Sequence, residues 1–417
     1  MGARFLPVRP GEAQRDLFRG VPGFRRLFLA TLGSSFGTYL AVVALTVDVY
    51  DESGGDANWV SALLIADFLP VIVVALAFAP LLDRLRRRGI LVAADLVRAA
   101  VFVVLPLADG PGQIVALALA AGVATSFFRP AVYSGLPNLV GDARLPDANS
   151  LLQSGENLAW ACGGVVGGIL VKVGGTDLAY WLNAVTFVVS ALLLLRIREA
   201  FEETAAAERP GYLAALRQGL AVVGESRALV TIAVAWSVAS VGAAIGNVSE
   251  IFLARDVFGR GSFGFGVLVA LTAFGLFAGS LAGGMLIGRF GIRRAYVCAI
   301  ALTAVGFGVA AASPSFWLAA AVVVLCGFGN GAAIVCNAVL VQRAVPDWIR
   351  GRAFTLVMSI GYACVGVGMI VAGPLTNAWG ARVAWGVAAA LCFGGAALAA
   401  ALLASPAELE PGTSPAS

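Results

Sequence analysis

Long apolar runs alternate with short polar segments along the whole chain. A run of about 20 apolar residues is the length of helix that crosses the hydrocarbon core of a bilayer. A membrane barrel would instead show alternating segments of about 10 residues, and this pattern is absent from the sequence. The pattern therefore predicts an all-α integral membrane protein with twelve transmembrane helices, near residues 27–49, 59–81, 90–108, 113–136, 148–171, 179–195, 228–253, 264–287, 295–312, 316–339, 354–375 and 383–403.

Composition supports this interpretation. The 417 residues are 60% hydrophobic and only 12% charged, with a mean hydropathy of +0.91. Soluble domains are close to half apolar and about a quarter charged. The chain is therefore expected to be embedded in lipid.

The distribution of positive charge predicts the orientation of the chain. Of the 28 Lys and Arg residues, only Lys172, Arg255, Arg260 and Arg382 fall in loops that would be external if the N-terminus is cytoplasmic. Cytoplasmic loops are enriched in Lys and Arg, so both termini are expected inside the cell. The net charge of +4 is then explained by topology, and no nucleic-acid partner is expected. Residues 1–26 carry six arginines and lack the features of a cleaved secretory signal.

The chemistry-bearing residues argue against an enzyme. The chain has no histidine, which is the commonest metal ligand and general base. Its six cysteines all fall within predicted helices without a C-x-x-C spacing, as expected for small packing residues. Glycine-rich segments such as "GGVVGG" lack the Lys-Ser/Thr of a phosphate-binding loop. We expect no metal, no cofactor and no catalytic site.

Three segments recur about 200 residues apart. "PLLDRLRRRGIL" at 80–91 is echoed by "GRFGIRRA", "LPDANSLLQS" at 145–154 by "VPDWIRGRAFTLVMS", and "ACGGVVGGIL" at 161–170 by "ACVGVGMIVAGPL". Echoes in one order predict a duplicated chain, with two parallel repeats of six helices. The expected parts are a cytoplasmic arm (1–26), a six-helix bundle (27–195), a cytoplasmic linker (196–227), a second six-helix bundle (228–403) and a cytoplasmic tail (404–417).

The loop after the second predicted helix carries a motif. The chain resembles the major facilitator superfamily, whose loop pattern is G-x-x-x-D-R-x-G-R-R. Asp83, Arg84, Arg87 and Arg88 match it, while Ala79 and Arg86 replace the two glycines. Segments such as "FFRPAVYSGLPNLV" resemble the branch that includes siderophore and macrolide exporters. The resemblance covers nearly the whole chain and implies the major facilitator fold.

The resemblance also implies a role for this loop. A carboxylate at Asp83 can accept hydrogen bonds from the free N–H groups at the start of a helix. In the family that helix is the eleventh, which here starts near Gly351 and Arg352. The four matching residues would then form a conformational latch on the cytoplasmic side. The alternative is a charge cluster that only orients the loop.

Ionisable residues inside predicted membrane helices indicate function by default. Asp67 and Glu156 are the candidates for proton coupling. Both could instead form structural ion pairs with Arg98 or Arg129. Asp95 and Arg98, one turn apart, suit a structural ion pair. Glu250 and Asp256, near the end of the seventh predicted helix, are expected to be a solvated rim.

The resemblance places a substrate cavity among helices 1, 4, 7 and 10. On helix 1, Thr31, Ser34 or Ser35, and Thr38 share one face by helical spacing. Such residues also serve interhelical hydrogen bonding, which is the alternative interpretation. The cavity candidates are Thr31, Ser35, Thr38, Arg129, Tyr133, Trp236, Ser240, Asn247, Asn330 and Asn337.

The expected function is secondary active transport. We expect a proton-coupled exporter of small amphipathic molecules, such as drugs, natural products or siderophores, that works by alternating access of its two halves. The alternatives are a nutrient importer or facilitator of the same fold, and a membrane receptor that does not transport. The expected partners are a small-molecule substrate, protons and the bilayer, and the protein is expected to act as a monomer in a bacterial cell membrane.

Overall fold

The computed structural model describes residues 12–77, 86–141, 144–197, 227–344 and 347–403, and this part of the chain is helical without strands. The elements are α1 (Glu12–Gly20), α2 (Pro22–Glu52), α3 (Ala57–Ala77), α5 (Arg87–Val104) with the 3-10 turn η1 (Leu105–Leu107), α6 (Pro111–Val140), α7 (Leu145–Leu195), α9 (Arg227–Phe252) with the π-helical η3 (Leu253–Val257), α10 (Gly261–Phe290), α11 (Ile292–Ala312), α12 (Phe316–Ala344) and α13 (Asp347–Leu402).

Nine helices in the described part are long and apolar enough to cross a membrane. Helix α3 contains a shorter apolar stretch, Ala57–Val71, which is apart from these nine. The prediction of an all-helical membrane protein is therefore confirmed.

Two of the long helices are bent at glycine. Gly175 in α7 has φ 76° and Gly380 in α13 has φ 81°, so the backbone leaves the helical conformation at each. Only glycine adopts this left-handed region without steric cost. Each helix therefore consists of two straight parts, and the bends fall between the apolar runs that the sequence pattern separated.

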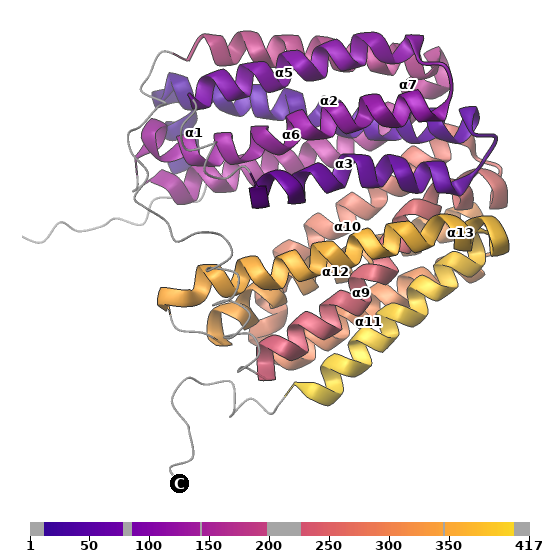
Figure 1. Cartoon of the computed structure of the whole chain (residues 1–417). Helices are drawn as coiled ribbons and strands as arrows, with labels where there is room; N and C mark the ends of the chain where they lie inside the picture. Colours follow the sequence, from indigo (N-terminus) through magenta and orange to yellow (C-terminus); the bar gives the residue numbers. More distant parts are fainter. Residues whose placement is uncertain (1–11, 78–85, 142–143, 198–226, 345–346, 404–417) are drawn as a thin grey trace, which may run out of the picture.

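The helices form two sets that lie one above the other in Figure 1, α2–α7 and α9–α13. Within the first set, α2 packs on α7, α3 on α6, and α5 on α6 and α7. Within the second, α9 packs on α13, α10 on α12, and α11 on α12 and α13. Each packing pair in the first set therefore has a counterpart at the same place in the chain order of the second.

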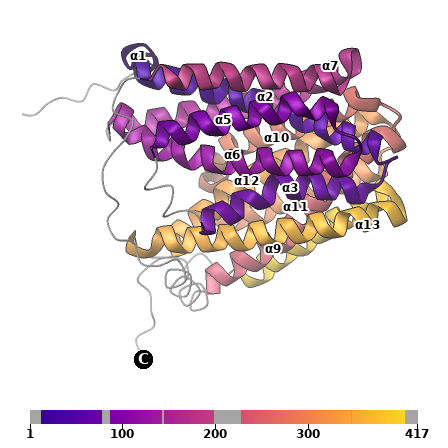
Figure 2. The same ribbon diagram turned by 45° about the horizontal axis from the view of Figure 1, so that its top comes forward.

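Two pairs of helices join the sets. Helix α7 packs on α10, and α3 packs on α13, beside which it lies in Figure 2. The contact between α7 and α10 depends on glycine, because a Cβ at Gly266 would lie 2.6 Å from the carbonyl oxygen of Gly164. A Cβ at Gly168 would similarly lie 2.9 Å from the carbonyl oxygen of Ser262. Small residues let two membrane helices approach this closely.

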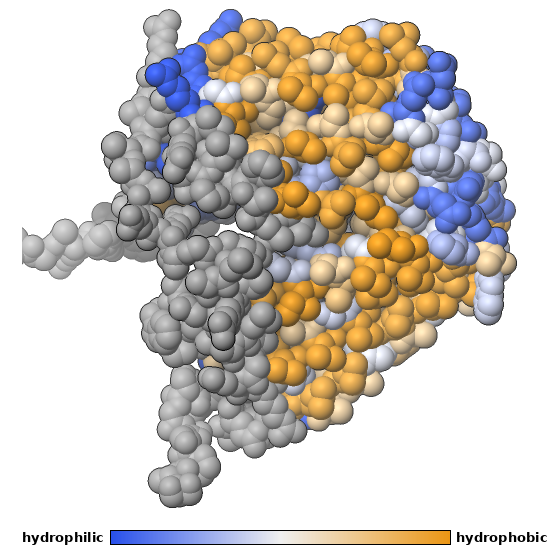
Figure 3. Space-filling view, in the orientation of Figure 1, coloured by the Kyte–Doolittle hydropathy of each residue, from blue (hydrophilic) through white to orange (hydrophobic). Residues whose placement is uncertain are grey.

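Figure 3 shows a broad band of apolar residues on the outer surface, which gives way to polar residues at the right-hand end. Large side chains such as Met285, Trp379 and Val173 are 69% to 78% exposed. A large exposed apolar surface of this kind is expected where helices face lipid. We refer to the end where α7 and α13 bend as the Gly175 end, and to the opposite end as the Arg88 end.

Candidate functional site

An ion pair lies between α6 and α7. The guanidinium of Arg129 donates a hydrogen bond of 2.8 Å to the carboxylate of Glu156. The Glu156 side chain is only 10% exposed, whereas that of Arg129 is 59% exposed. Tyr133, one turn after Arg129, lies close enough to hydrogen-bond to the guanidinium. Of the two partners left open by the sequence, Glu156 therefore pairs with Arg129.

Aromatic rings flank this ion pair. The ring of Tyr39 on α2 stacks on that of Trp160 on α7, with centroids 5.5 Å apart and an interplanar angle of 17°. Tyr39 also lies within electrostatic range of Asp67, Arg129 and Glu156. We call Tyr39, Arg129, Tyr133, Glu156 and Trp160 the aromatic ion-pair cluster. It offers a flat apolar surface beside a charge of each sign.

Sequence reasoning missed Tyr39. Its residue type alone gave no signal, but it lies one helical turn after Ser35 and so continues one side of the predicted polar face of helix 1. Trp160 did carry a signal, since it shares a helical face with Glu156 at a spacing of four residues. The structure brings both rings together.

Asp67 lines a small, mostly apolar cavity. The cavity has a volume of about 30 Å³, and its lining includes Thr38, Asp67, Arg98 and Thr125. This volume is enough for a single water molecule. Within the described part of the chain, Asp67 forms no ion pair, since Arg98 pairs with Asp95 instead.

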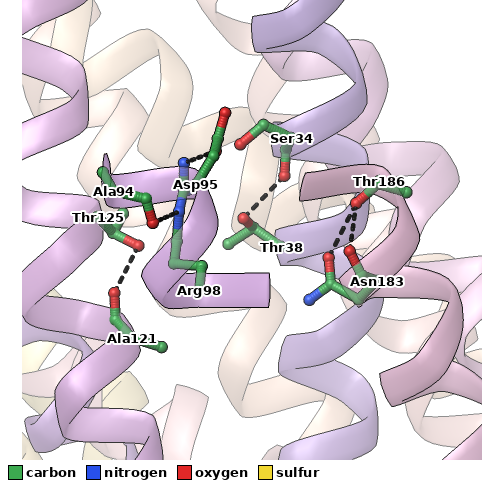
Figure 4. A network of polar contacts seen from close by, with 9 residues as sticks. All are labelled: Ser34, Thr38, Ala94, Asp95, Arg98, Ala121, Thr125, Asn183 and Thr186. Atoms are coloured by element: carbon green, nitrogen blue, oxygen red, sulfur yellow. Dashed lines mark hydrogen bonds and ion pairs between the residues drawn. The ribbon is translucent and has the colours of Figure 1, made fainter. Parts of the chain in front are cut away.

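Asp95 and Arg98 are buried together in the first set of helices (Figure 4). They form an ion pair within α5, and the Arg98 guanidinium lies 4.5 Å from the ring centre of Phe128 and 4.3 Å from that of Phe187. Ser34 on α2 also lies beside the Asp95 carboxylate. This arrangement connects α2, α5, α6 and α7, and it is closed to solvent.

The cavity candidates on the second set of helices surround a separate space. A cavity of about 160 Å³ is lined by Trp236, Ser240, Asn247 and Asn330, with Thr303 from α11. Asn337 is not among the lining residues, because it is 3% exposed and lies beside Tyr296. On α2, Thr31 is 4% exposed, Ser35 is half-buried and Thr38 lines the small cavity near Asp67. The predicted cavity residues are therefore divided among this cavity, the small cavity near Asp67 and the aromatic ion-pair cluster. Thr31, Ser35 and Asn337 belong to none of the three.

A larger cavity of about 1150 Å³ lies at the Arg88 end of α10, α11, α12 and α13. Its described lining is mostly apolar and includes Arg293, Arg294 and Arg343. None of the predicted site residues belongs to that described lining.

Polar contacts between the two sets of helices gather at the Gly175 end. The Arg255 guanidinium on η3 lies 2.7 Å from the carboxylate of Asp51 on α2, and Asp256 accepts a hydrogen bond from the Tyr50 hydroxyl. Asn377 on α13 donates to the Asp56 carboxylate over 2.6 Å and accepts from the Ala57 N–H over 2.8 Å. This end of the molecule is held together by side chains from α2, η3 and α13 and from the loop that precedes α3.

The structure corrects one expectation about this region. Glu250 was predicted to be part of a solvated rim, but it is only 7% exposed in α9. Its carboxyl group lies 3.5 Å from the Thr272 hydroxyl of α10 and within electrostatic range of Cys326 on α12, neighbours that a position count from the predicted helix end cannot reveal. Asp256 is exposed as predicted, although it is engaged by Tyr50.

The predicted latch can be described only in part. Asp83 and Arg84 lie outside the described residues. Arg88 donates hydrogen bonds of 3.1 Å to the carbonyl oxygen of Ile197 and 2.6 Å to that of Leu195. It thus satisfies carbonyl groups at the end of α7, where a cation also complements the helix dipole. Arg87 contributes no described contact with α13, so the latch remains a prediction.

The class of protein is a membrane transporter with many spans. Its surface has an apolar belt, its two sets of helices repeat the same packing pairs, and charged and aromatic side chains are enclosed among α2, α5, α6 and α7. The comparison with known proteins specifies it further. The chain belongs to the transmembrane secretion effector family of the major facilitator superfamily, since the family model matches residues 19–413. The predicted superfamily is thereby confirmed, as is the prediction that the protein is not an enzyme.

Individual relatives agree with this family. The chain is 29% identical over 370 residues to the multidrug efflux pump Tap of Mycolicibacterium fortuitum, covering 85% of this chain and 89% of the relative. It is 25% identical over 385 residues to the uncharacterized MFS-type transporter YfiS of Bacillus subtilis, covering 89% and 91%. These relatives are bacterial, which implies a cell membrane location.

A solved structure shares the fold. The crystal structure of a bacterial homologue of the iron transporter ferroportin, in an inward-facing state, superposes with a TM-score of 0.74 at 13% sequence identity. The similarity covers 90% of this chain and 97% of that one. At this identity the likeness concerns the fold alone.

Proposed function

We propose that this protein is a proton-coupled exporter of small amphipathic molecules. The observation that carries the proposal is the aromatic ion-pair cluster, in which stacked rings lie beside Arg129 and Glu156 inside a membrane-spanning bundle. Rings can bind an apolar scaffold and the ion pair can exchange partners with a polar group of the substrate. The name of the relative Tap, a multidrug efflux pump, supports a substrate of this kind.

The proposed architecture has twelve spans. Counting α7 and α13 as two helices each at Gly175 and Gly380, and adding α3 to the nine candidate spans, gives two bundles of six. The repeated packing pairs support this division into 27–195 and 228–403. The remaining parts are the arm 1–26, the linker 196–227 and the tail 404–417, all of which we propose to be cytoplasmic.

The proposed mechanism is alternating access. The Gly175 end would face the outside, because the Arg-rich loops belong at the cytoplasmic side. Its cross-set contacts then close the external side in this conformation. Opening would require the two bundles to rock against each other. The proposed pivot is the glycine contact between α7 and α10, where the bundles would change their angle while the two helices stay packed.

Asp67 and Glu156 are the proposed proton carriers. Asp67 lines a cavity whose volume is sufficient for one water molecule, and Glu156 has a cationic partner, Arg129, that a substrate could displace. Proton binding and release at such groups can be linked to conformation, since a charged group in the bilayer interior is costly unless it is paired.

The experiment is a flux measurement in energised inverted vesicles. The panel contains hydrophobic antibiotics, dyes and ferric chelators, each with and without a protonophore. Uptake that the protonophore abolishes, and that Asp67→Asn or Glu156→Gln reduces, supports a proton-driven exporter. Uptake that is indifferent to the protonophore contradicts proton coupling. Accumulation in the opposite direction, measured in right-side-out vesicles, would establish an importer, and saturable binding without flux a receptor.

A further inference from the structure

Glu250 is a buried carboxyl group that the proposed mechanism does not use. It lies on α9, near the Gly175 end, and is 7% exposed. The Thr272 hydroxyl on α10 lies 3.5 Å from Glu250 Oε1, and this hydroxyl also donates to the Leu268 carbonyl at 3.0 Å. The carboxyl group therefore receives at most one weak hydrogen bond from α10.

The surroundings of Glu250 contain no compensating charge within the described part of the chain. From α12 the titratable neighbour is the thiol of Cys326, which is itself near Cys392 of α13. Arg255 and Asp256 follow on the same helical path but are engaged with α2. A buried carboxylate without a cation is strongly disfavoured, whereas the protonated form is tolerated. This environment therefore favours the neutral, protonated form of the carboxyl group.

Helices α10 and α12 pack closely on each other beside Glu250. A Cβ at Gly327 of α12 would lie 2.0 Å from the carbonyl oxygen of Thr272 on α10. A Cβ at Gly275 of α10 would lie 2.2 Å from the carbonyl oxygen of Val324 on α12. The two helices beside Glu250 thus pack closely on each other, which restricts the access of water to its carboxyl group from between them.

Glu250 also connects two features that the fold places on either side of it. One turn earlier, Asn247 lines the 160 Å³ cavity that extends to Trp236. That cavity has mostly apolar walls with polar groups from Ser240, Asn247, Thr303 and Asn330, and its volume is sufficient for several water molecules. Directly after Glu250, α9 passes into the π-helical η3, which presents Arg255 and Asp256 to Asp51 and Tyr50. Such π segments are frequent at functional sites.

We infer that Glu250 is a proton-binding residue that couples its protonation to closure of the Gly175 end. The neutral carboxyl group fits the closed conformation seen here. Loss of its proton to water requires hydration, and this loosens the packing of α9 against α10 and α12 next to η3. The step is a transfer of one proton between water and a carboxylate, with no other bond made or broken. The inference rests on the proposed proton-driven transport, to which it adds a site in the second bundle.

The test uses the purified full chain in lipid vesicles and reads proton binding without any substrate. Infrared difference spectra between mildly acidic and mildly alkaline pH should contain a carbonyl stretch from a protonated, poorly hydrogen-bonded carboxyl group. Glu250→Gln should remove this band, and Glu156→Gln should leave it. Thr272→Val deletes the one hydrogen bond and should shift the band to higher frequency, which gives a second variant if Glu250→Gln folds poorly. An unchanged spectrum in both Glu250→Gln and Thr272→Val would overturn the inference.

Hydrogen exchange measures the coupling itself. In the wild-type protein, amides around 50–58 and 253–262 should exchange faster at alkaline pH, after correction for the intrinsic rate. Glu250→Gln, which is permanently neutral, should keep them slow at both pH values. A pH response that survives in this variant contradicts the coupling. The infrared and hydrogen exchange readouts do not depend on flux. If the wild-type protein showed no protonophore-sensitive transport, the proposed function would be rejected, while proton binding by Glu250 would still be tested by these two readouts.

Discussion

The guanidinium of Arg255 on η3 lies 2.7 Å from the carboxylate of Asp51 on α2 and 4.4 Å from the centre of the Tyr50 ring. Asp256, the next residue, accepts a hydrogen bond from the same Tyr50. Two neighbouring residues of one set of helices are therefore bonded to two neighbouring residues of the other. Because the bonds cross between sets that are otherwise joined mainly by apolar and backbone contacts, they can be broken without unfolding either set.

Removing this contact should favour opening of the Gly175 end. Asp51 is 51% exposed and Arg255 24% exposed, so solvent screens their attraction and the pair contributes about 0.2–1 kcal/mol. We expect Arg255→Gln to increase hydrogen exchange of residues 50–58 by roughly threefold at low salt, and by less at high salt. The exchanged pair Asp51→Arg with Arg255→Asp should recover protection. Equal protection in the wild type and Arg255→Gln would show that the contact does not hold this end closed.

The Arg129–Glu156 pair should have separable effects on stability and transport. Arg129→Ala leaves a carboxylate that is only 10% exposed without its cation, and we expect a loss of about 1–3 kcal/mol, reduced from the buried-pair range because Arg129 itself is 59% exposed. Arg129→Ala combined with Glu156→Ala should recover most of the stability but none of the flux. Thermal unfolding in detergent and vesicle flux measure the two effects. Recovery of flux in the double variant would make the pair purely structural.

The Asp95–Arg98 pair, unlike Arg129–Glu156, should matter for stability and not for transport. Arg98→Met alone strands a buried carboxylate and should cost about 3–5 kcal/mol. Asp95→Leu with Arg98→Met replaces the pair by apolar groups beside Phe128 and Phe187, which is often neutral for stability. We expect the double variant to fold and to transport. A folded but inactive double variant would assign this pair a role in coupling, through the cavity that it shares with Asp67.

Close packing of α7 and α10 provides another test with a matched control. An alanine Cβ at Gly266 would meet the Gly164 carbonyl at 2.6 Å, whereas at Gly284 of the same helix it would meet no atom within 4 Å. Gly266→Ala should force the helices apart and lower transport severalfold. Gly284→Ala should preserve transport and raise stability by roughly 0.5–1 kcal/mol through helix propensity. Equal transport by the two variants would exclude a close glycine contact.

The hydrophobic pattern was sufficient to predict the helices, because apolar runs of membrane length are determined by the bilayer and not by neighbouring helices. Their ends were predicted less well. The first predicted helix, 27–49, extends from Pro22 to Glu52, since Arg25, Arg26 and Asp51 continue the helix beyond the apolar core. The break at Gly175 falls between the predicted helices 148–171 and 179–195, although the helix runs up to it without a loop.

The side-chain environments depended on packing that one sequence does not contain. Glu250 was wrongly placed at a solvated rim because its depth was counted along α9, while its neighbours Thr272 and Cys326 belong to α10 and α12. Tyr39 was overlooked because its partners lie on α3, α6 and α7. By contrast, Asp95 and Arg98 are three residues apart on one helix, so local spacing predicted their contact.

The stack of Tyr39 on Trp160 should determine which substrates are accepted. Trp160→Ala removes a large flat surface at the aromatic ion-pair cluster, so aromatic dyes should lose affinity, by up to about tenfold if the stacking is worth 0.5–1.5 kcal/mol. Tyr39→Phe keeps the ring and removes only the hydroxyl that lies within electrostatic range of Asp67, Arg129 and Glu156. It should therefore preserve dye affinity and change the pH dependence of flux. Concentration-dependent flux of a transported dye measures both variants, and if Tyr39→Phe lowered dye affinity as much as Trp160→Ala, the ring surface would not be the binding determinant.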